Sequence, residues 1–217
     1  MKFAISSSAV LVALAFAGPA QAQTQVVSIG HSGPLSGPNA FAGKDNENGV
    51  RMAVEELNAK KIKVGGKTLE FKLNSEDDQC DARSGVSVGQ KFVDDGVKFV
   101  MGPYCSGVAI PASRVYSQGG TMVSTVGTNP KVTDNGYKNL FRIIASDTQI
   151  GSNMATYAAN VMKVKNVAVI DDRTAFGQGV ADEFSKEAKK LGLNIVGHEF
   201  TTDKSTDFLA ILTNLKA

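Results

Sequence analysis

The chain has 217 residues, of which 42% are hydrophobic and 20% are charged, and its formal net charge is +2. This is the composition of an ordinary folded protein, and it excludes a disordered or collagen-like chain. The nearly balanced charge gives no support to nucleic-acid binding or to a membrane-surface role, so neither partner is expected.

The first 22 residues have the layout of a secretory signal peptide. Lys2 supplies a positive start, an apolar stretch follows at 9–18, and Ala20-Gln21-Ala22 provides an Ala-x-Ala cleavage motif. The apolar stretch is shorter than the roughly 20 residues that span a bilayer. We therefore expect cleavage after Ala22 and export of the mature chain. A buried N-terminal helix is the alternative.

Strand and helix patterns alternate along the rest of the chain. Alternating or continuous apolar runs predict strands, and apolar residues three and four positions apart predict helices. Val50, Ala53, Val54 and Leu57, for example, are expected to form one buried helical stripe. The expected elements are strands at 25–31, 68–74, 97–101, 121–124, 139–144, 166–170 and 193–200, and helices at 45–59, 81–94, 108–118, 148–162, 180–191 and 207–216. This alternation is typical of an α/β fold with parallel sheets and right-handed crossovers.

Two loops rich in Gly, Pro and hydroxyl residues follow neighbouring strands. Residues 102–107 follow the strand at 97–101, and residues 126–130 follow the strand at 121–124. Both loops should lie at the carboxyl edge of one parallel sheet, where open α/β sheets hold ligands. The first loop also opens a helix, whose free N–H groups favour a carboxylate. Because no Walker lysine follows, a nucleotide phosphate is disfavoured, and no cofactor is expected.

Two other loops are open to more than one interpretation. Residues 32–43 are either a plain connector or a ligand-facing loop that carries the aromatic Phe41, and we favour the second because the loop leads into a helix. The acidic stretch at 75–80 is expected at the end of a strand, with its acidic side chains in a solvated loop. A bound cation is the alternative, but the spacing does not match an EF-hand.

The two cysteines, Cys80 and Cys105, lie 25 positions apart. Export to an oxidising compartment makes a disulfide the leading interpretation, with a stabilising effect of roughly 3 kcal/mol. A pair of free core thiols is the alternative. A catalytic cysteine is less favoured because only His31 and His198 could serve as its base, and the Cys and His spacing does not fit a zinc site, so no metal is expected.

Residues 85–89 match the G-x-S-x-G pattern of secreted hydrolases, with Ser87 as the nucleophile. That chemistry needs a sharp strand-to-helix turn before the serine. Here the pattern lies inside a helical period, so we interpret it as chance and expect neither an enzyme nor a catalytic residue.

A crossing between two lobes is expected at 145–147. After it only two strands are predicted, which is too few for a self-sufficient lobe. We therefore expect a first lobe at 23–145 and the start of an incomplete second lobe at 146–217, with a hinge near 144–147.

Several stretches, in this order and spacing, resemble the periplasmic branched-chain amino-acid binding proteins, the leucine/isoleucine/valine receptors of ABC importers. The resemblance covers residues 25–217. The matching stretches are PLSGP at 34–38, NGVRMA at 48–53, DDQCD at 77–81, FVMGPYCS at 99–106, PAS at 111–113, GTNP at 127–130 and DDRTAFGQG at 171–179.

The resemblance implies a type I periplasmic binding protein fold, in which two Rossmann-like lobes close on a free amino acid. It also implies the Cys80–Cys105 disulfide, a monomer in the periplasm, and delivery of a leucine-type ligand to an ABC permease in the inner membrane. A sensory ligand-binding domain is one alternative function. A receptor of the same fold for amides, urea or another small acid is another.

The resemblance further assigns ligand-binding residues. From composition alone, Ser106 and Thr128 are ordinary turn formers. By resemblance, they hold the ligand's α-carboxylate and α-ammonium groups with the help of the Val126 carbonyl. Tyr104 and Phe41 fall where the side-chain pocket is, and Phe176 stands where relatives often carry Tyr. The family's second-lobe ammonium ligands would lie beyond Ala217.

Overall fold

The computed structural model describes residues 23–202 and 204–216 of the chain. The expected signal peptide and its cleavage site lie outside the described residues. Among the helices that the structure describes, none combines the length and the apolar character needed to cross a membrane.

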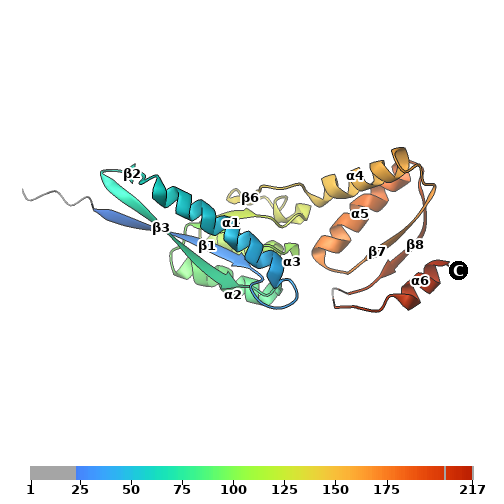
Figure 1. Ribbon diagram of the computed structural model, residues 1–217, viewed down its shortest axis with the longest axis horizontal. Coiled ribbons are helices and arrows are strands. Elements are labelled where there is room, and N and C mark those ends of the chain that lie inside the picture. The colour runs from blue at the N-terminus through green and yellow to red at the C-terminus, as the bar shows by residue number, and fades with distance from the viewer. Residues whose placement is uncertain (1–22, 203, 217) are drawn as a thin grey trace, which may run out of the picture.

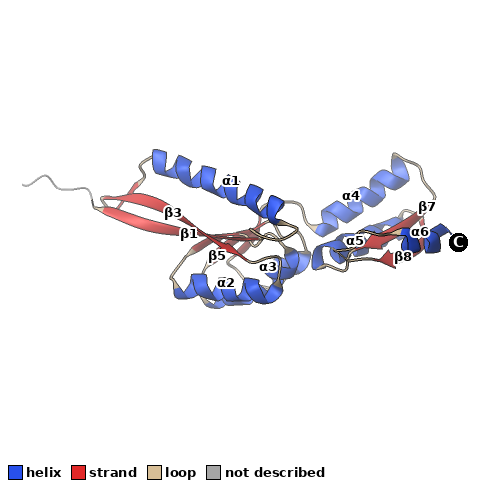
Figure 2. Ribbon diagram, turned by 60° about the horizontal axis from the view of Figure 1, so that its bottom comes forward, coloured by secondary structure: helices blue, strands red, loops and turns tan. Residues whose placement is uncertain are grey.

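The N-terminal part, residues 24–142, is built on one six-stranded sheet. Its strand order is β2-β3-β1-β4-β5-β6, and all neighbours pair in parallel except β2 with β3. Figure 2 shows α1 over one face of this sheet, with α2 and α3 against the other. Its elements are β1 (Thr24–Gly33), α1 (Ala40–Ala59), β2 (Lys63–Val64), β3 (Lys67–Asp77), α2 (Ala82–Asp94), β4 (Phe99–Met101), α3 (Ser106–Gln118), β5 (Met122–Thr125), the 3-10 turn η1 (Pro130–Val132) and β6 (Leu140–Arg142).

The C-terminal part, residues 147–216, is smaller. It consists of α4 (Asp147–Asn160), β7 (Asn166–Asp171), α5 (Ala175–Lys190), β8 (Asn194–Phe200) and α6 (Leu209–Lys216), with β7 and β8 paired in parallel. The two parts lie end to end, joined by the segment between β6 and α4 (Figure 1). The α/β fold with parallel sheets agrees with the sequence prediction.

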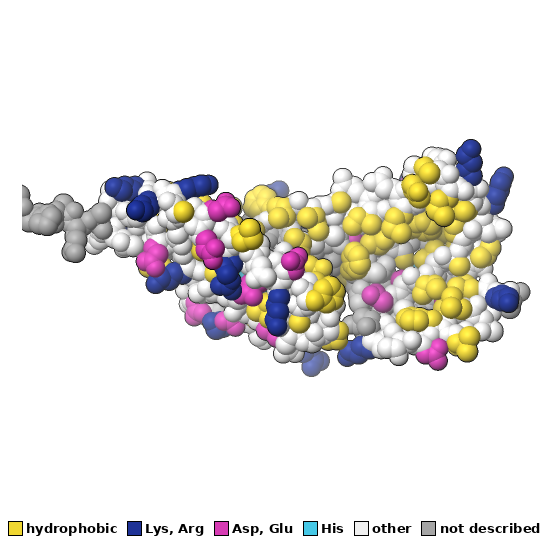
Figure 3. Space-filling view, in the orientation of Figure 1, with side chains coloured by type: hydrophobic (Ala, Val, Ile, Leu, Met, Phe, Trp, Pro, Cys, Tyr) yellow, Lys and Arg dark blue, Asp and Glu magenta, His cyan; other side chains and the backbone are white. Residues whose placement is uncertain are grey.

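The main hydrophobic core lies between the six-stranded sheet and the α2–α3 pair. Its fully buried members include Phe92 on α2, Val100 on β4 and Tyr116 on α3. Small side chains let α4 and α5 pack closely in the C-terminal part, where Ala155 and Ala188 are both fully buried. Hydrophobic side chains also gather on the surface of this part (Figure 3). Its exposed hydrophobic residues include Ile170, Val196 and Leu212.

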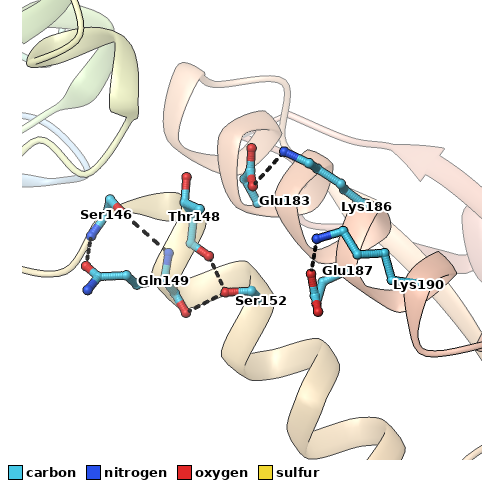
Figure 4. A network of polar contacts seen from close by, with 8 residues as sticks. All are labelled: Ser146, Thr148, Gln149, Ser152, Glu183, Lys186, Glu187 and Lys190. Atoms are coloured by element: carbon cyan, nitrogen blue, oxygen red, sulfur yellow. Dashed lines mark hydrogen bonds and ion pairs between the residues drawn. The ribbon is translucent and has the colours of Figure 1, made fainter.

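Helix α4 begins with a complete capping box, which Figure 4 shows. The Gln149 N–H donates to the Ser146 hydroxyl at 3.3 Å, and the Ser146 N–H donates to the Gln149 side-chain oxygen at 3.0 Å. Two otherwise unpaired N–H groups are thereby satisfied. The capping box anchors the start of α4 directly after the crossing segment.

Several predicted boundaries were wrong. α1 begins at Ala40 rather than at residue 45, and α5 begins at Ala175 rather than at residue 180. In α5 the Thr174 hydroxyl accepts from the Gly177 N–H at 3.0 Å and caps the helix within the stretch predicted as a loop. The buried stripe predicted for α1 is confirmed at Val50 and Val54, but Ala53 is exposed.

The short hairpin between β2 and β3 was missed. Gly65 and Gly66 both have positive φ, 58° and 79°, which is the backbone that a two-residue turn between antiparallel strands requires. The Gly-Gly pair between Val64 and Lys67 is the signal that could have revealed this hairpin.

His31 lies at the end of β1 with its side chain fully buried. Its Nδ1 donates to the Met101 carbonyl at 3.0 Å, since a carbonyl oxygen can only accept. Burial lowers the pKa of His31 below its ordinary value of 6.5, and this outweighs the opposing effect of the Met101 carbonyl. The imidazole is therefore neutral in the folded protein at neutral pH.

We expect His31 to make the folded protein less stable in mild acid. Below pH 6.5 the unfolded chain binds the proton more readily than the folded one, so stability is present above that pH and is lost as the pH falls. The loss is at most about 1.4 kcal/mol per pH unit. Urea unfolding of the wild type and of His31→Asn between about pH 7.5 and pH 5 measures it. Parallel pH profiles for the two proteins would contradict the assignment.

Candidate functional site

A cleft of ≈ 550 Å³ opens where the carboxyl ends of β4 and β5 face the start of α5. Both parts of the chain therefore contribute to its walls. The lining residues are Asn39, Cys80, Tyr104, Cys105, Ser106, Gly107, Val126, Thr128, Ile144, Ile150, Asp172, Thr174 and Phe176.

Ser106 is the first residue of α3 and is almost fully buried beside the cleft. Its hydroxyl accepts from the Asn129 N–H at 3.2 Å, so it ties the loop after β4 to the loop after β5. The N–H groups of Ser106 and Gly107 belong to the first turn of α3, which has no intrahelical carbonyls to pair with. This corner of the cleft therefore presents N–H donors and partial positive charge.

The loop after β5 forms the adjoining wall. Val126 is half-buried and Thr128 is buried, and both line the cleft. The loop is held from below by the Thr125 hydroxyl, which donates to the Pro103 carbonyl at 2.6 Å and accepts from the Gly127 N–H at 2.9 Å. Two buried hydroxyls, those of Thr125 and Ser106, thus hold the loops after β4 and β5 against each other.

Aromatic side chains complete the cleft. Tyr104 and Phe176 line it from opposite parts of the chain, and Phe176 is 47% exposed. Phe41 is 78% exposed and lies in a neighbouring hollow of ≈ 640 Å³. That hollow shares Tyr104 and Val126 with the cleft. The structure therefore brings five of the six predicted ligand-binding residues together and places Phe41 beside them.

The acidic stretch at 75–80 is not a solvated loop, and this prediction was wrong. Asp78 is fully buried, accepting from the Ser32 hydroxyl at 2.7 Å and from the Cys80 N–H at 3.0 Å. Burial raises the pKa of Asp78, although these donors oppose the rise. Within residues 23–202 and 204–216, no cluster of three His, Cys, Asp or Glu side chains is arranged to hold a metal ion.

The neighbouring carboxylate, Asp77, binds the loop that follows β1. Its carboxylate accepts from the Leu35 N–H at 2.8 Å, from the Gln79 N–H at 3.0 Å, and from the Ser36 hydroxyl. Burial by itself raises the pKa of Asp77, but the Ser36 hydroxyl and the N–H donors outweigh it, and the net result is a lowered pKa. Asp77 therefore fastens the loop between β1 and α1 to the end of β3.

Cys80 and Cys105 form the predicted disulfide, with their Cα atoms 5.5 Å apart. Cys105 is the residue that precedes α3, and both cysteines line the cleft. The disulfide therefore joins the end of β3 to the N-terminus of α3 and forms part of the wall.

Sequence reasoning missed several lining residues. Ile150 carried no motif of its own, because it reaches the cleft only through the packing of the two parts. Asn39 belongs to the loop at 32–43 that was favoured as ligand-facing, and Ile144 belongs to the predicted hinge, but neither was singled out as a lining residue. Asp172 and Thr174 lie in the 171–179 stretch and follow a strand, which is a signal that could have found them. Asp172 is the one charged side chain among the described residues that line the cleft. One of its oxygens accepts from the Thr174 N–H at 2.9 Å and from the Thr174 hydroxyl at 2.7 Å.

A family model described as periplasmic binding protein matches residues 26–217. The chain belongs to this family. It is 38% identical to a Leu/Ile/Val-binding protein homolog 1 from Brucella abortus (strain 2308), covering 99% of this chain and 57% of that protein. It is also 38% identical to the Leu/Ile/Val-binding protein BraC3 of Rhizobium johnstonii, covering 97% and 56% of the two chains. The chain therefore spans about half the length of these relatives.

Solved structures place the fold among the type I periplasmic binding proteins. The branched-chain amino-acid substrate-binding protein LivJ of Streptococcus pneumoniae, in complex with isoleucine, superposes with a TM-score of 0.79 at 25% identity. The match covers 89% of this chain and 54% of LivJ. A solute-binding protein from R. palustris in complex with 4-hydroxybenzoate has a TM-score of 0.75 at 20% identity, covering 88% and 51%.

The family and the fold are those of substrate-binding proteins. The G-x-S-x-G pattern does not form a nucleophile elbow in this structure, because Ser87 lies inside α2. Its hydroxyl donates to the Arg83 carbonyl one turn earlier, at 3.1 Å. Ser87 is thus an exposed serine bonded to its own helix, and the pattern lies inside a helix as the sequence predicted.

We expect removal of the disulfide to destabilise the protein by about 3 kcal/mol, because the unfolded chain gains the entropy of an open 25-residue loop. Denaturant unfolding with and without a reducing agent measures the effect. The Cys80→Ser/Cys105→Ser double variant is the control, since its midpoint should not respond to the reducing agent. An unchanged wild-type midpoint, with both thiols titrating as free, would contradict the expectation.

Proposed function

We propose that this chain forms the ligand-binding cleft of an extracytoplasmic solute-binding protein that captures a free amino acid of the branched-chain class. The protein then delivers its ligand to an ABC permease in the inner membrane. The observation that carries the proposal is the cleft itself, in which Ser106, Thr128 and the start of α3 converge on one space lined by both parts of the chain. The names of the relatives point to the same class of ligand.

The polar wall fits a zwitterion. Ser106 and the free N–H groups at the start of α3 are donors for the α-carboxylate, and a helix N-terminus favours such an anion. The Val126 carbonyl and the Thr128 hydroxyl are acceptors for the α-ammonium group. Asp172 adds a negative charge to the same cleft, and no lysine or arginine lines it among the described residues. This balance favours a ligand that carries both a carboxylate and an ammonium group over one that is only an acid.

The apolar wall fits an aliphatic side chain. Tyr104, Ile144, Ile150 and Phe176 lie around the remainder of the cleft. Burying a leucine or isoleucine side chain against such a surface contributes about 1.5–3 kcal/mol. Phe41, which lies in the neighbouring hollow, is assigned to the rim of this pocket.

We assign the first lobe to residues 23–145 and the beginning of the second to residues 146–217, with the hinge at 144–147. Closure of the cleft would bring Phe176 and Asp172 toward Ser106 and Thr128, a rigid-body movement about a short segment. Export through the 1–22 leader, cleavage after Ala22, a periplasmic location, a monomeric state and binding without catalysis belong to the same proposal.

Isoleucine should bind to the full-length protein more tightly than 3-methylpentanoate, its analogue without the ammonium group. The expected difference is about tenfold or more, since a charged hydrogen bond contributes about 1.5–3 kcal/mol. Titration calorimetry with leucine, isoleucine, 3-methylpentanoate and 4-hydroxybenzoate tests this. Heat with 4-hydroxybenzoate alone would favour a receptor for aromatic acids instead.

Ser106→Ala and Thr128→Ala should each weaken isoleucine binding by about 1–3 kcal/mol, because a buried ligand group would lose its partner. Ser87→Ala is the matched control, since that serine is exposed on α2 and bonds only to its own helix. Calorimetry with isoleucine on the three variants distinguishes the loss of a ligand contact from the loss of a surface hydroxyl. Equal affinity in all of them would refute the assignment of the polar wall.

A further inference from the structure

A fully buried carboxylate lies at the junction of the two parts. Asp147 is the first residue of α4, directly after the crossing segment, and its side chain has no exposed surface. Neither of its carboxylate oxygens makes a well-formed hydrogen bond within the part of the chain that the structure describes. A buried charge without partners is costly, so its position calls for an explanation.

The neighbours of Asp147 include a residue of the cleft wall. Its N–H donates to the Thr128 carbonyl at 2.9 Å. Burial raises the pKa of Asp147, whereas the Thr128 hydroxyl, Arg142 and the Asn129 amide lie close enough to lower it, and Glu183 on α5 adds to the rise. The Thr128 hydroxyl is itself buried without a well-formed partner among the described residues. A small rotation of this hydroxyl would let it donate to the carboxylate.

The C-terminal part packs against this carboxylate at a glycine of α5. A Cβ atom built on Gly179 of α5 would lie 2.0 Å from Oδ2 of Asp147 and 2.7 Å from Nδ2 of Asn129, so a larger residue there would have to displace these side chains. Nδ2 of Asn129 also donates to the Ala175 carbonyl at the start of α5, at 2.7 Å. The loop that carries Thr128, the start of α4 and the first turns of α5 therefore meet at one point.

We propose that Asp147 is a positioning residue that sets the hydrogen-bonding direction of Thr128, and that Gly179 lets α5 close over this pair. A hydroxyl has one hydrogen to donate. When Thr128 donates it to Asp147, the hydroxyl oxygen has only lone pairs left for a ligand and acts only as an acceptor, which suits an ammonium group and not a carboxylate. The proposal rests on the proposed function and deepens it, because it assigns discrimination between amino acids and simple acids to a residue outside the cleft.

The test measures discrimination, which is the dissociation constant of 3-methylpentanoate divided by that of isoleucine. In Asp147→Leu, which removes the acceptor and keeps the branched outline of the side chain, discrimination should fall by about tenfold. Thr128→Val should lower it equally, and the double variant should lower it no further, because the two residues act as one unit. Unchanged discrimination in a folded Asp147→Leu, or additive losses in the double variant, would overturn the proposal.

A second variant approaches the same contact from α5 and keeps Asp147 intact. Gly179→Ala should weaken the binding of isoleucine, because its methyl group occupies the space of the Asp147 carboxylate. Gly49→Ala is the matched control, since a Cβ atom there meets nothing within 4 Å. Equal isoleucine affinity in the two glycine variants would overturn the role of Gly179.

Hydrogen exchange of the ligand-free protein separates this proposal from the proposed function. In Gly179→Ala, and not in Gly49→Ala, exchange should accelerate in the segments 126–130 and 175–181. If the wild type bound no ligand of the panel, the proposed function would fail and the exchange result would still decide whether α5 closes on Asp147. Identical exchange in the two variants would overturn that contact.

Discussion

The cleft depends on the parallel alignment of β1, β4 and β5, because that alignment brings the loops after these strands to one edge of the sheet. Loops at such an edge are held in place only if their backbone groups find partners there. Here the partners are buried side chains. Asp78 accepts a hydrogen bond from the Ser32 hydroxyl at the end of β1. The Thr125 hydroxyl donates to the Pro103 carbonyl in the loop after β4. The backbone of the loops that line the cleft is thus held in place by a layer of buried polar side chains.

This arrangement explains how a cleft with little charge could hold a fully charged ligand. Oriented N–H groups, hydroxyls and carbonyls present partial charges of both signs, which match the two charges of a zwitterion. A lysine or arginine would bind the carboxylate more strongly but would repel the ammonium group. A single acidic side chain, Asp172, shifts the balance toward the ammonium end, and its tie to Thr174 keeps it at the edge of the cleft.

Much of the fold could be predicted from the sequence, because strands and helices with a buried face carry a periodic signal. The loops that hold Ser106 and Thr128 could be located for the same reason, since each directly follows such a strand. The prediction failed where local hydrogen bonding overrides the periodic pattern. Thr174 caps α5 inside a glycine-containing stretch, and Asp78 is buried because Ser32 and the Cys80 N–H satisfy it. The place of Ile150 in the cleft and the contacts of Asp147 with Thr128 and α5 could not be predicted, since both depend on how the two parts of the chain pack together.

The central place of β1 in the six-stranded sheet also bears on how this part of the chain folds. Its residue Ile29 pairs with Leu73 of β3 on one side and with Phe99 of β4 on the other. Both neighbours come later in the chain, so the first strand has no parallel partner until long loops have closed. Contacts between residues far apart in sequence slow folding, because the entropy of loop closure is lost before the pairing compensates for it. β1 therefore gains its second neighbour only after synthesis has reached β4 at Phe99–Met101.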